Sequence, residues 1–218
     1  MTETLTAAEP IKKGRKYDDV IEGARVVFMR DGFEGANVDN IAREAGVSKA
    51  TLYSYFPDKS HLFKAVLLIE CKRHAGAVTD HLHEGMALRD ILLRQCQFFT
   101  RFLLSDWAQE MFRVCVGEAR RFPELGRSFY EAGPESMRGA LIEFLQSPVV
   151  QAEMDIDDPE MAADQLKMLC HSDVFLKKMF GLVESANEDD INRVANAAVE
   201  TFMARYARRG ATVAEAAE

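Results

Sequence analysis

The chain has 218 residues, of which 48% are hydrophobic and 28% are charged, with a formal net charge of −8. This composition excludes global disorder, and no 18-residue stretch free of charged residues suggests a membrane-spanning helix. Residues 1–10 lack the apolar stretch of a signal peptide and the four cysteines form no CxxC pair, so we expect reduced thiols in the cytoplasm.

Four helices are expected in the N-terminal part, after a polar arm at residues 1–14 that ends in a basic cluster. They cover residues 15–30, 38–45, 49–55 and 59–78. Gly32 can end the first helix, because glycine adopts the left-handed conformation at low cost. Asn37, Ser48 and Asp58 can cap the N-termini of the other three.

The remaining chain also has apolar residues at helical spacing, which predicts an all-α fold. Five further helices are expected, over residues 86–105, 108–121, 124–146, 159–184 and 188–209. The expected domains are an N-terminal head over 15–64 and a larger helical body over 65–210, followed by a weakly patterned tail over 211–218.

Charge is unevenly distributed between these domains. Residues 11–64 hold ten basic and eight acidic side chains, a net +2, whereas residues 65–218 hold 17 basic and 25 acidic ones, a net −8. A mildly basic module on an acidic body fits a DNA-binding head joined to a regulatory domain. A solvated charged surface would give the same counts, so charge alone leaves both interpretations open.

The most informative stretch is residues 38–56, VDNIAREAGVSKATLYSYF. Two short helices joined by a tight turn containing Gly46 describe a helix-turn-helix. Ile41 and Leu52 are expected to point inward, and Val47 to fill the turn. The second helix then exposes side chains that suit phosphates and base edges. These side chains are Ser48, Lys49, Thr51, Tyr53 and Tyr55. A plain helical hairpin remains the alternative from the pattern alone.

The run from Asp31 to Phe63, DGFEGANVDNIAREAGVSKATLYSYFPDKSHLF, resembles the DNA-binding head of the TetR family of bacterial repressors. The matching residues are Gly32-Phe33, Ile41-Ala42, the run 45–48, Leu52-Tyr53, Tyr55-Phe56, Lys59 and Leu62-Phe63. The resemblance is close over 15–64 and elsewhere extends only to helical layout and length. Val38 departs from the family pattern, because many members have Thr or Ser there, and Asn37 is the candidate substitute for that hydroxyl.

The resemblance implies that the helix over 49–55 enters the major groove, where Lys49 and Thr51 are candidates for base contacts. The side chains that resemble the family's phosphate contacts are Tyr53, Tyr55 and Lys59. The positive end of the helix that starts at Lys59 would assist its phosphate contact. The other candidates for DNA contact are Arg15, Asn37, Arg43 and Ser48. A solvated surface side chain is the alternative for each.

The last two expected helices, 159–184 and 188–209, are candidates for dimerisation. The second of them has an apolar stripe formed by Ile191, Val194, Ala195, Ala198, Phe202 and Tyr206. The resemblance implies that both helices form a four-helix bundle with their copies in a second subunit, although packing within one chain would require the same stripe. Two heads about 34–36 Å apart, or a multiple of a helical turn, would read a palindrome.

The middle of the chain is rich in aromatic residues. Its stretch 111–134, MFRVCVGEARRFPELGRSFYEAGP, looks like the ligand domain of AefR-like regulators. In this family the effector site lies within the helical body, and methionine and aromatic side chains suit lipophilic ligands. The candidate ligand-binding residues are Phe98, Phe102, Met111, Phe112, Cys115, His171 and Phe175. Aromatic residues at helical spacing are also ordinary core residues.

The sequence therefore predicts a three-helix helix-turn-helix head followed by a ligand-binding and dimerisation domain. The expected function is transcriptional repression by a dimer that binds a palindromic operator and is released by a small lipophilic effector. A DNA-binding regulator or activator without an effector is the alternative. No catalytic constellation or paired metal ligands stand out, so no enzyme, metal site or cofactor is expected. An acidic body would be repelled by anionic lipid, so no membrane partner is expected.

Overall fold

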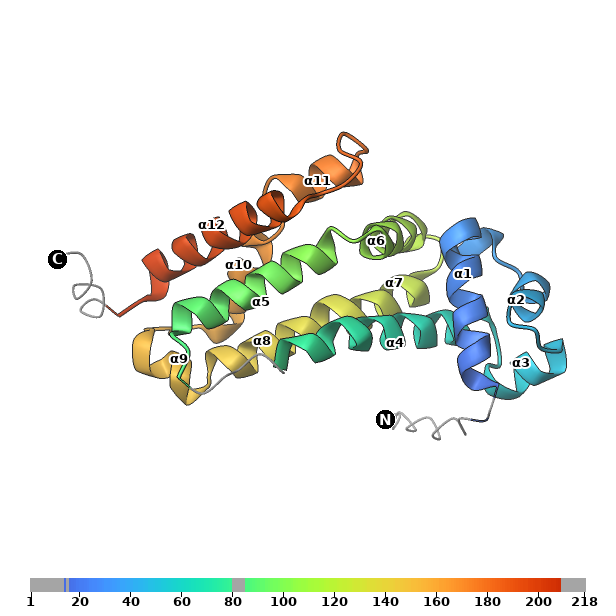
Figure 1. The fold of residues 1–218 in the computed structure, drawn as a ribbon. Helices are drawn as coiled ribbons and strands as arrows, with labels where there is room; N and C mark the ends of the chain where they lie inside the picture. Colours follow the sequence, from blue (N-terminus) through green and yellow to red (C-terminus); the bar gives the residue numbers. More distant parts are fainter. Residues whose placement is uncertain (1–13, 15, 80–84, 209–218) are drawn as a thin grey trace. The chain divides into compact units, whose positions relative to one another are not determined.

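The computed structural model describes residue 14, residues 16–79 and residues 85–208. In this described part the regular elements are helices joined by turns and loops, with one isolated antiparallel bridge between Met154 and Ala207 (Figure 1). The prediction of an all-α fold is confirmed. The chain divides into two compact units, Met1–Leu67 and Leu68–Glu218. The arm before Gly14, Arg15 and the tail over 211–218 lie outside the described residues.

The first unit contains the three helices of the head and the start of a fourth. They are α1 (Tyr17–Gly35), α2 (Val38–Glu44), α3 (Lys49–Tyr55) and α4 (Lys59–Thr79). The expected end of the first helix was too early, because α1 continues past Arg30. Its backbone is nevertheless non-helical at Gly32, where φ is 70°. Glycine adopts this conformation without the steric cost that a side chain would impose, so Gly32 kinks the element that it was expected to end.

Three phenylalanines form the centre of the core in the first unit. Phe28 and Phe33 come from α1 and Phe63 from α4, and all three are buried. The ring centroid of Phe63 lies 4.9 Å from that of Phe28 and 5.2 Å from that of Phe33, both in edge-on geometry. Leu52 of α3 and Ile41 of α2 are fully buried as well. Burial of these side chains fixes the two short helices against α1 and α4.

The second unit continues α4 and adds the remaining helices. They are α5 (Leu88–Leu103), α6 (Asp106–Glu118), α7 (Pro123–Tyr130), the π-helical turn η1 (Glu131–Glu135), α8 (Ser136–Leu145), α9 (Pro148–Glu153), α10 (Pro159–Leu169), α11 (Val174–Met179) and α12 (Glu188–Tyr206). Figure 1 shows α5 and α12 running side by side. Polar contacts join them as well, among them the hydrogen bond from Gln97 Nε2 to Asn192 Oδ1 at 2.8 Å and the ion pair of Arg101 with Glu188 at 2.6 Å.

The apolar stripe of α12 lies in this intrachain core. Ala195, Ala198, Phe202 and Tyr206 are buried in one cluster with residues of α5 and α10. Ile191 and Val194 are buried in a second cluster, which contains Phe175 of α11. The stripe expected to face a second subunit therefore faces its own chain. Periodicity identifies a buried face but does not distinguish a neighbouring helix of the same chain from one of another chain.

Two of the expected long helices are interrupted in the structure. The helix expected over 124–146 consists of α7, η1 and α8, and the π-helical turn contains Pro134. Proline has no N–H to donate and its ring obstructs regular α-helical packing, so the wider turn accommodates it. The helix expected over 159–184 ends at Leu169 and resumes at Val174, and Asp173 between them has a φ of 59°.

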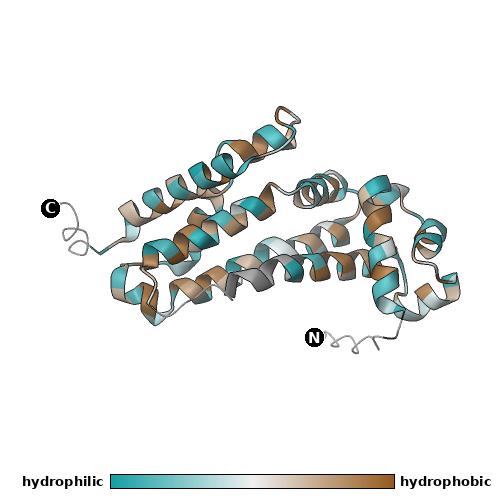
Figure 2. Cartoon of the chain, viewed as in Figure 1, coloured by the Kyte–Doolittle hydropathy of each residue, from teal (hydrophilic) through white to brown (hydrophobic). Residues whose placement is uncertain are grey.

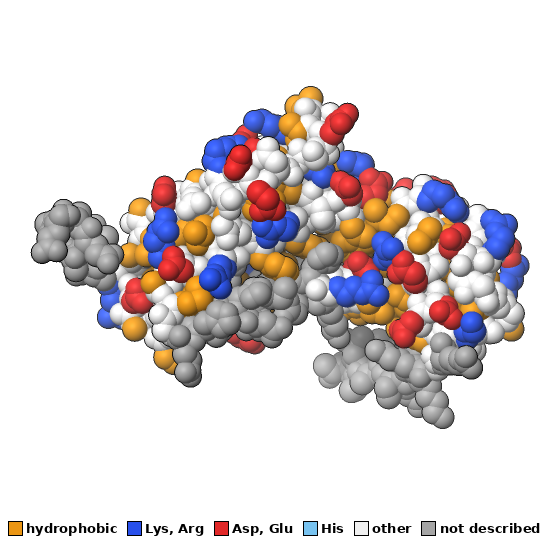
Figure 3. Space-filling view, viewed as in Figure 1, with side chains coloured by type: hydrophobic (Ala, Val, Ile, Leu, Met, Phe, Trp, Pro, Cys, Tyr) orange, Lys and Arg blue, Asp and Glu red, His pale blue; other side chains and the backbone are white. Residues whose placement is uncertain are grey.

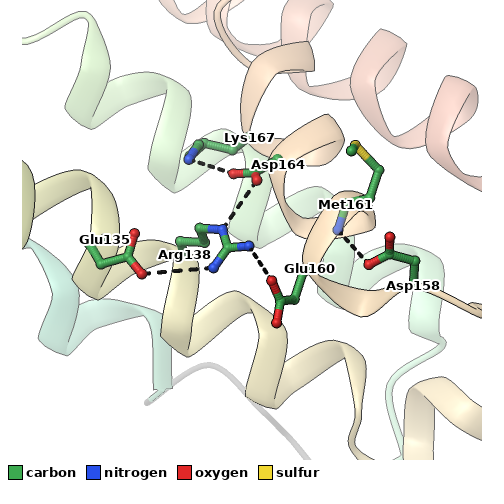
Figure 4. Close-up of polar contacts among 7 residues, drawn as sticks. All are labelled: Glu135, Arg138, Asp158, Glu160, Met161, Asp164 and Lys167. Carbon is green, nitrogen blue, oxygen red and sulfur yellow. Dashed lines mark hydrogen bonds and ion pairs between the residues drawn. The ribbon is translucent and has the colours of Figure 1, made fainter.

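A cluster of charged side chains joins α8 to α10 (Figure 4). Arg138 of α8 bonds Glu160 at 2.8 Å and Asp164 at 3.1 Å, both on α10. Lys167 also donates to Asp164, at 2.9 Å, and the two cations hold the pKa of that carboxyl below its usual value. Arg138 thus connects two carboxylates on successive turns of the same helix, which fixes the rotation of α8 about its axis.

Figure 2 shows hydrophilic and hydrophobic residues interspersed along the helices. Among the described helices, none is both long and apolar enough to cross a membrane.

Candidate DNA-binding site

The turn between α2 and α3 has the geometry of a helix-turn-helix. Gly46 adopts a φ of 61°, and Val47 N–H donates to the carbonyl oxygen of Ala42 at 2.9 Å. These features close the turn within four residues. Val47 is half-buried and Leu52 fully buried, in agreement with the expected roles in the turn and the core. The predicted helix-turn-helix is therefore present in the structure.

Asn37 and Ser48 cap the two helices of this motif. The side-chain oxygen of Asn37 accepts from Asn40 N–H at 2.8 Å, and that of Ser48 accepts from Thr51 N–H at 3.1 Å. The hydroxyls of Ser48 and Thr51 also lie 2.9 Å apart. Both caps were predicted from the sequence. They hold the N-terminal turn of α3 in place, so its exposed side chains start from a fixed backbone.

The candidate DNA contacts on α3 differ in how far they are exposed. Lys49 and Tyr53 are exposed and Thr51 is half-buried, so all three reach the surface. Tyr55 is half-buried against Tyr17 of α1, with ring centroids 5.8 Å apart and edge-on. Lys49, Thr51 and Tyr53 are therefore available at the surface of α3. Tyr55, at the C-terminal end of the helix, instead packs partly against α1.

Two cationic candidates are engaged with neighbours on α2. Lys49 forms an ion pair with Asp39, and Arg43 donates to Asn40 Oδ1 at 2.8 Å. An exposed ion pair contributes little to stability, because water competes for both charges. Lys49 could therefore leave Asp39 to contact a base edge with little loss of stability in the head.

Lys59 has a structural role beside the phosphate contact expected of it. Its ammonium donates to the carbonyl oxygens of Ala36 at 3.0 Å and Glu34 at 3.2 Å, and lies 4.6 Å from the centroid of the Phe33 ring. These contacts tie the start of α4 to the end of α1. The phosphate contact of Lys59 stays a prediction, as does that of Arg15, which lies outside the described residues.

Gly23 contributes to the head in a way that the sequence analysis missed. A Cβ atom at this position would lie 2.6 Å from the backbone nitrogen of Ala45. Gly23 therefore lets α1 approach the C-terminal end of α2 closely. An isolated glycine inside an apolar helical pattern is the signal that could have identified this contact.

Three of the seven candidate ligand-binding residues meet in the second unit. The ring of Phe175 on α11 lies 5.7 Å from that of Phe112 on α6 and 4.6 Å from that of His171, both edge-on. Burial lowers the pKa of His171, so its imidazole is neutral near pH 7. Met111 and Cys115 are buried on α6.

Phe98 and Phe102 lie on α5 and are half-buried. The ring of Phe102 lies 6.2 Å from that of Trp107. The place of Phe98 and Phe102 in a common site with the Phe112, His171 and Phe175 cluster stays a prediction. Gln109, a buried amide one turn before Phe112, was missed because nothing in the sequence shows that this amide is buried.

Comparisons with known proteins agree with this architecture. Residues 20–66 match the model of bacterial regulatory proteins of the tetR family, and residues 90–208 match the C-terminal domain of AefR-like transcriptional repressors. The repressor AcnR of Corynebacterium glutamicum is 30% identical over 77 residues, which cover 35% of this chain and 41% of AcnR. The chain thus spans less than half the length of this curated relative.

Two solved structures are similar over most of the chain. A TetR-family transcriptional regulator from Mesorhizobium loti is 28% identical with a TM-score of 0.79, covering 90% of this chain and all of that one. The flavonoid-responsive regulator FrrA is 32% identical with a TM-score of 0.73, covering 91% of this chain and all of FrrA. With its helix-turn-helix and its match to the AefR-like C-terminal domain, the chain belongs to the TetR family of bacterial transcriptional regulators.

Proposed function

We propose that the protein is a transcriptional repressor that binds a palindromic operator as a homodimer and is released from it by a small effector. The observation that carries the DNA-binding part is the capped and exposed helix α3 in a helix-turn-helix head. Its N-terminal turn presents Lys49 and Thr51 at the surface, and these are the side chains that we propose to read base edges in the major groove. The repressors among the relatives support the direction of regulation.

Tyr53→Phe is expected to weaken binding to operator and non-operator DNA by a similar factor, about three- to tenfold, because it removes one hydroxyl contact to a phosphate. Tyr53 is exposed, so the loss of its hydroxyl should leave the fold unchanged. Fluorescence anisotropy on a duplex selected from a random-sequence library would measure both affinities.

Tyr130→Phe is the matched control, since Tyr130 is an exposed tyrosine of α7 in the second unit. Its affinity for both duplexes should equal that of the unaltered protein. A Tyr53→Phe variant with unchanged affinity would show that α3 docks with another face toward the backbone. Thr51→Ala is expected to change sequence preference instead, because a base contact is specific.

An exposed apolar face supports dimerisation. Five large hydrophobic side chains of α10, α11 and the following loop are more than half exposed: Met161, Met168, Leu176, Phe180 and Leu182. Hydrophobic side chains gather at the loop between α11 and α12, at the top of Figure 3. A face of this kind is typical of a contact surface, and a second copy presents the same face. It replaces the α12 stripe as the proposed interface.

The Phe112, His171 and Phe175 cluster supports an effector site in the second unit, where edge-on rings leave faces and edges suited to another aromatic molecule. FrrA is described as flavonoid-responsive. We infer that the effector of this protein is likewise a small aromatic molecule.

Cys115→Trp is expected to abolish release from DNA while operator affinity stays within about twofold, because the larger side chain occupies the buried face of α6, and Cys115 is no part of the helix-turn-helix. The measurement is anisotropy of the selected duplex with and without fractions of a bacterial metabolite extract. Val116→Trp, at an exposed position on the same helix, is the control. Normal release of the Cys115→Trp variant would place the effector elsewhere.

A further inference from the structure

A buried amide oxygen on α6 lacks the hydrogen bond that its burial calls for. The Nε2 of Gln109 donates to the carbonyl oxygen of Leu103 at 2.9 Å. A carbonyl oxygen only accepts, so this bond fixes the orientation of the amide, and Oε1 points away from Leu103. Oε1 has no hydrogen-bond partner among the described residues, although Gln109 is only 2% exposed. In native proteins most buried polar atoms of this kind have a hydrogen-bond partner.

His171 offers a second acceptor in the same unit. Its Nδ1 lies 2.9 Å from the carbonyl oxygen of Lys167 and therefore carries the proton. In the neutral imidazole the lone pair is then on Nε2, which can only accept. The ring lies edge-on to Phe99, 5.9 Å away, and to Phe175, 4.6 Å away. An acceptor is thus set among aromatic side chains.

The two acceptors are linked by aromatic side chains. Phe112 follows Gln109 by three residues, and so lies one turn further along the same side of α6. Its ring lies 5.7 Å from that of Phe175, which in turn contacts His171. The arrangement combines apolar ring surface with two hydrogen-bond acceptors, an amide oxygen and an imidazole nitrogen.

We propose that the effector is a hydroxylated aromatic molecule, and that Gln109 Oε1 and His171 Nε2 accept hydrogen bonds from its hydroxyl groups while Phe112 and Phe175 contact its rings. An aromatic hydrocarbon would leave Gln109 Oε1 without a partner, and a carboxylate would be repelled by both acceptors. Phenolic O–H groups supply the donors that this site lacks. This inference rests on the ligand-responsive part of the proposed function and specifies the ligand class.

The test compares two probes, 7,4′-dihydroxyflavone and 7,4′-dimethoxyflavone, which differ only in whether two oxygens carry a hydrogen or a methyl group, so that each proposed acceptor has one donor. Titration calorimetry on the full chain is expected to show at least about tenfold tighter binding of the hydroxy compound. Gln109→Met keeps the length of the side chain and should reduce this preference by weakening the hydroxy compound alone. Gln97→Met, at a half-buried amide that bonds Asn192, is the matched control and should keep the preference.

His171→Phe serves as the second variant if Gln109→Met melts before the assay temperature, because it keeps a ring beside Phe175 and removes the acceptor. It should also reduce the preference. Equal binding of the two flavones, binding of neither, or a preference that is undiminished in both variants would overturn the proposal. Equal release from DNA by both flavones would overturn the hydrogen-bond assignment but support a ligand-responsive repressor, whereas no release by any extract fraction would contradict the proposed function itself.

Discussion

Replacing Phe180 and Leu182 together by glutamate is expected to convert dimers to monomers and to weaken operator binding by at least about a hundredfold. Phe180 is 76% exposed and Leu182 is 74% exposed, beside the exposed Leu176 of α11. In a two-fold contact the same patch meets its own copy, so each substitution places charge in the interface twice. One recognition helix buries little surface against DNA. High affinity for the operator therefore requires two heads that are linked in a dimer and contact both half-sites together.

Light scattering would measure the mass of the protein in solution. Fluorescence anisotropy would measure its affinity for the selected duplex. Val116→Glu is the control, because Val116 is exposed on α6 and lies outside the proposed face. The control should stay dimeric with unchanged affinity. A dimeric double-glutamate variant would place the interface elsewhere, and a monomeric one with full operator affinity would contradict the need for two linked heads.

Gly23→Ala is expected to lower the melting temperature of the head and to reduce DNA affinity at least tenfold. In an open helix this change would stabilise by about 1 kcal/mol, because alanine has the higher helix propensity. Here the new Cβ would lie 2.6 Å from the nitrogen and 2.8 Å from the Cα of Ala45, both backbone atoms. Relief requires a shift of the α2–α3 turn, and overpacking of this kind costs about 1–3 kcal/mol.

Gly117→Ala on α6 is the matched control, since a Cβ there meets nothing within 4 Å. It should leave DNA affinity unchanged and the melting temperature equal or higher. Differential scanning calorimetry and anisotropy would measure both properties. A Gly23→Ala variant as stable and as active as the unaltered protein would show that α1 and α2 separate at no cost, contrary to the packing described for the head.

The head was predictable from the sequence because its signals are local. Asn37 and Ser48 each precede a short helix and cap it, and Gly46 supplies the left-handed residue of the turn between them. Each signal acts over a few residues, so a single sequence reveals it. The exposed candidates Lys49 and Tyr53 followed from the same motif. The contacts of Lys59 with Glu34 and Ala36 were not predictable, because they join residues more than 20 positions apart.

The body was less predictable because its breaks depend on distant residues. No glycine or proline lies between Cys170 and Asp173, so the apolar spacing predicted one uninterrupted helix. Asp173 instead has a positive φ, and its carboxylate pairs with Lys177 and with Arg193 of α12. Gln109 escaped notice for a similar reason, since only the fold shows that its amide oxygen is buried without a partner.

The π-helical turn at Glu131–Glu135 has a consequence for how this protein tolerates insertions and deletions. A π turn accommodates one residue more than an α turn. Deleting Pro134, which the wider turn accommodates, would restore regular helix and rotate everything after it by about 100° relative to α7. Arg138 would then no longer face Glu160 and Asp164. In this segment the number of residues, more than their identity, determines which side of α8 meets α10.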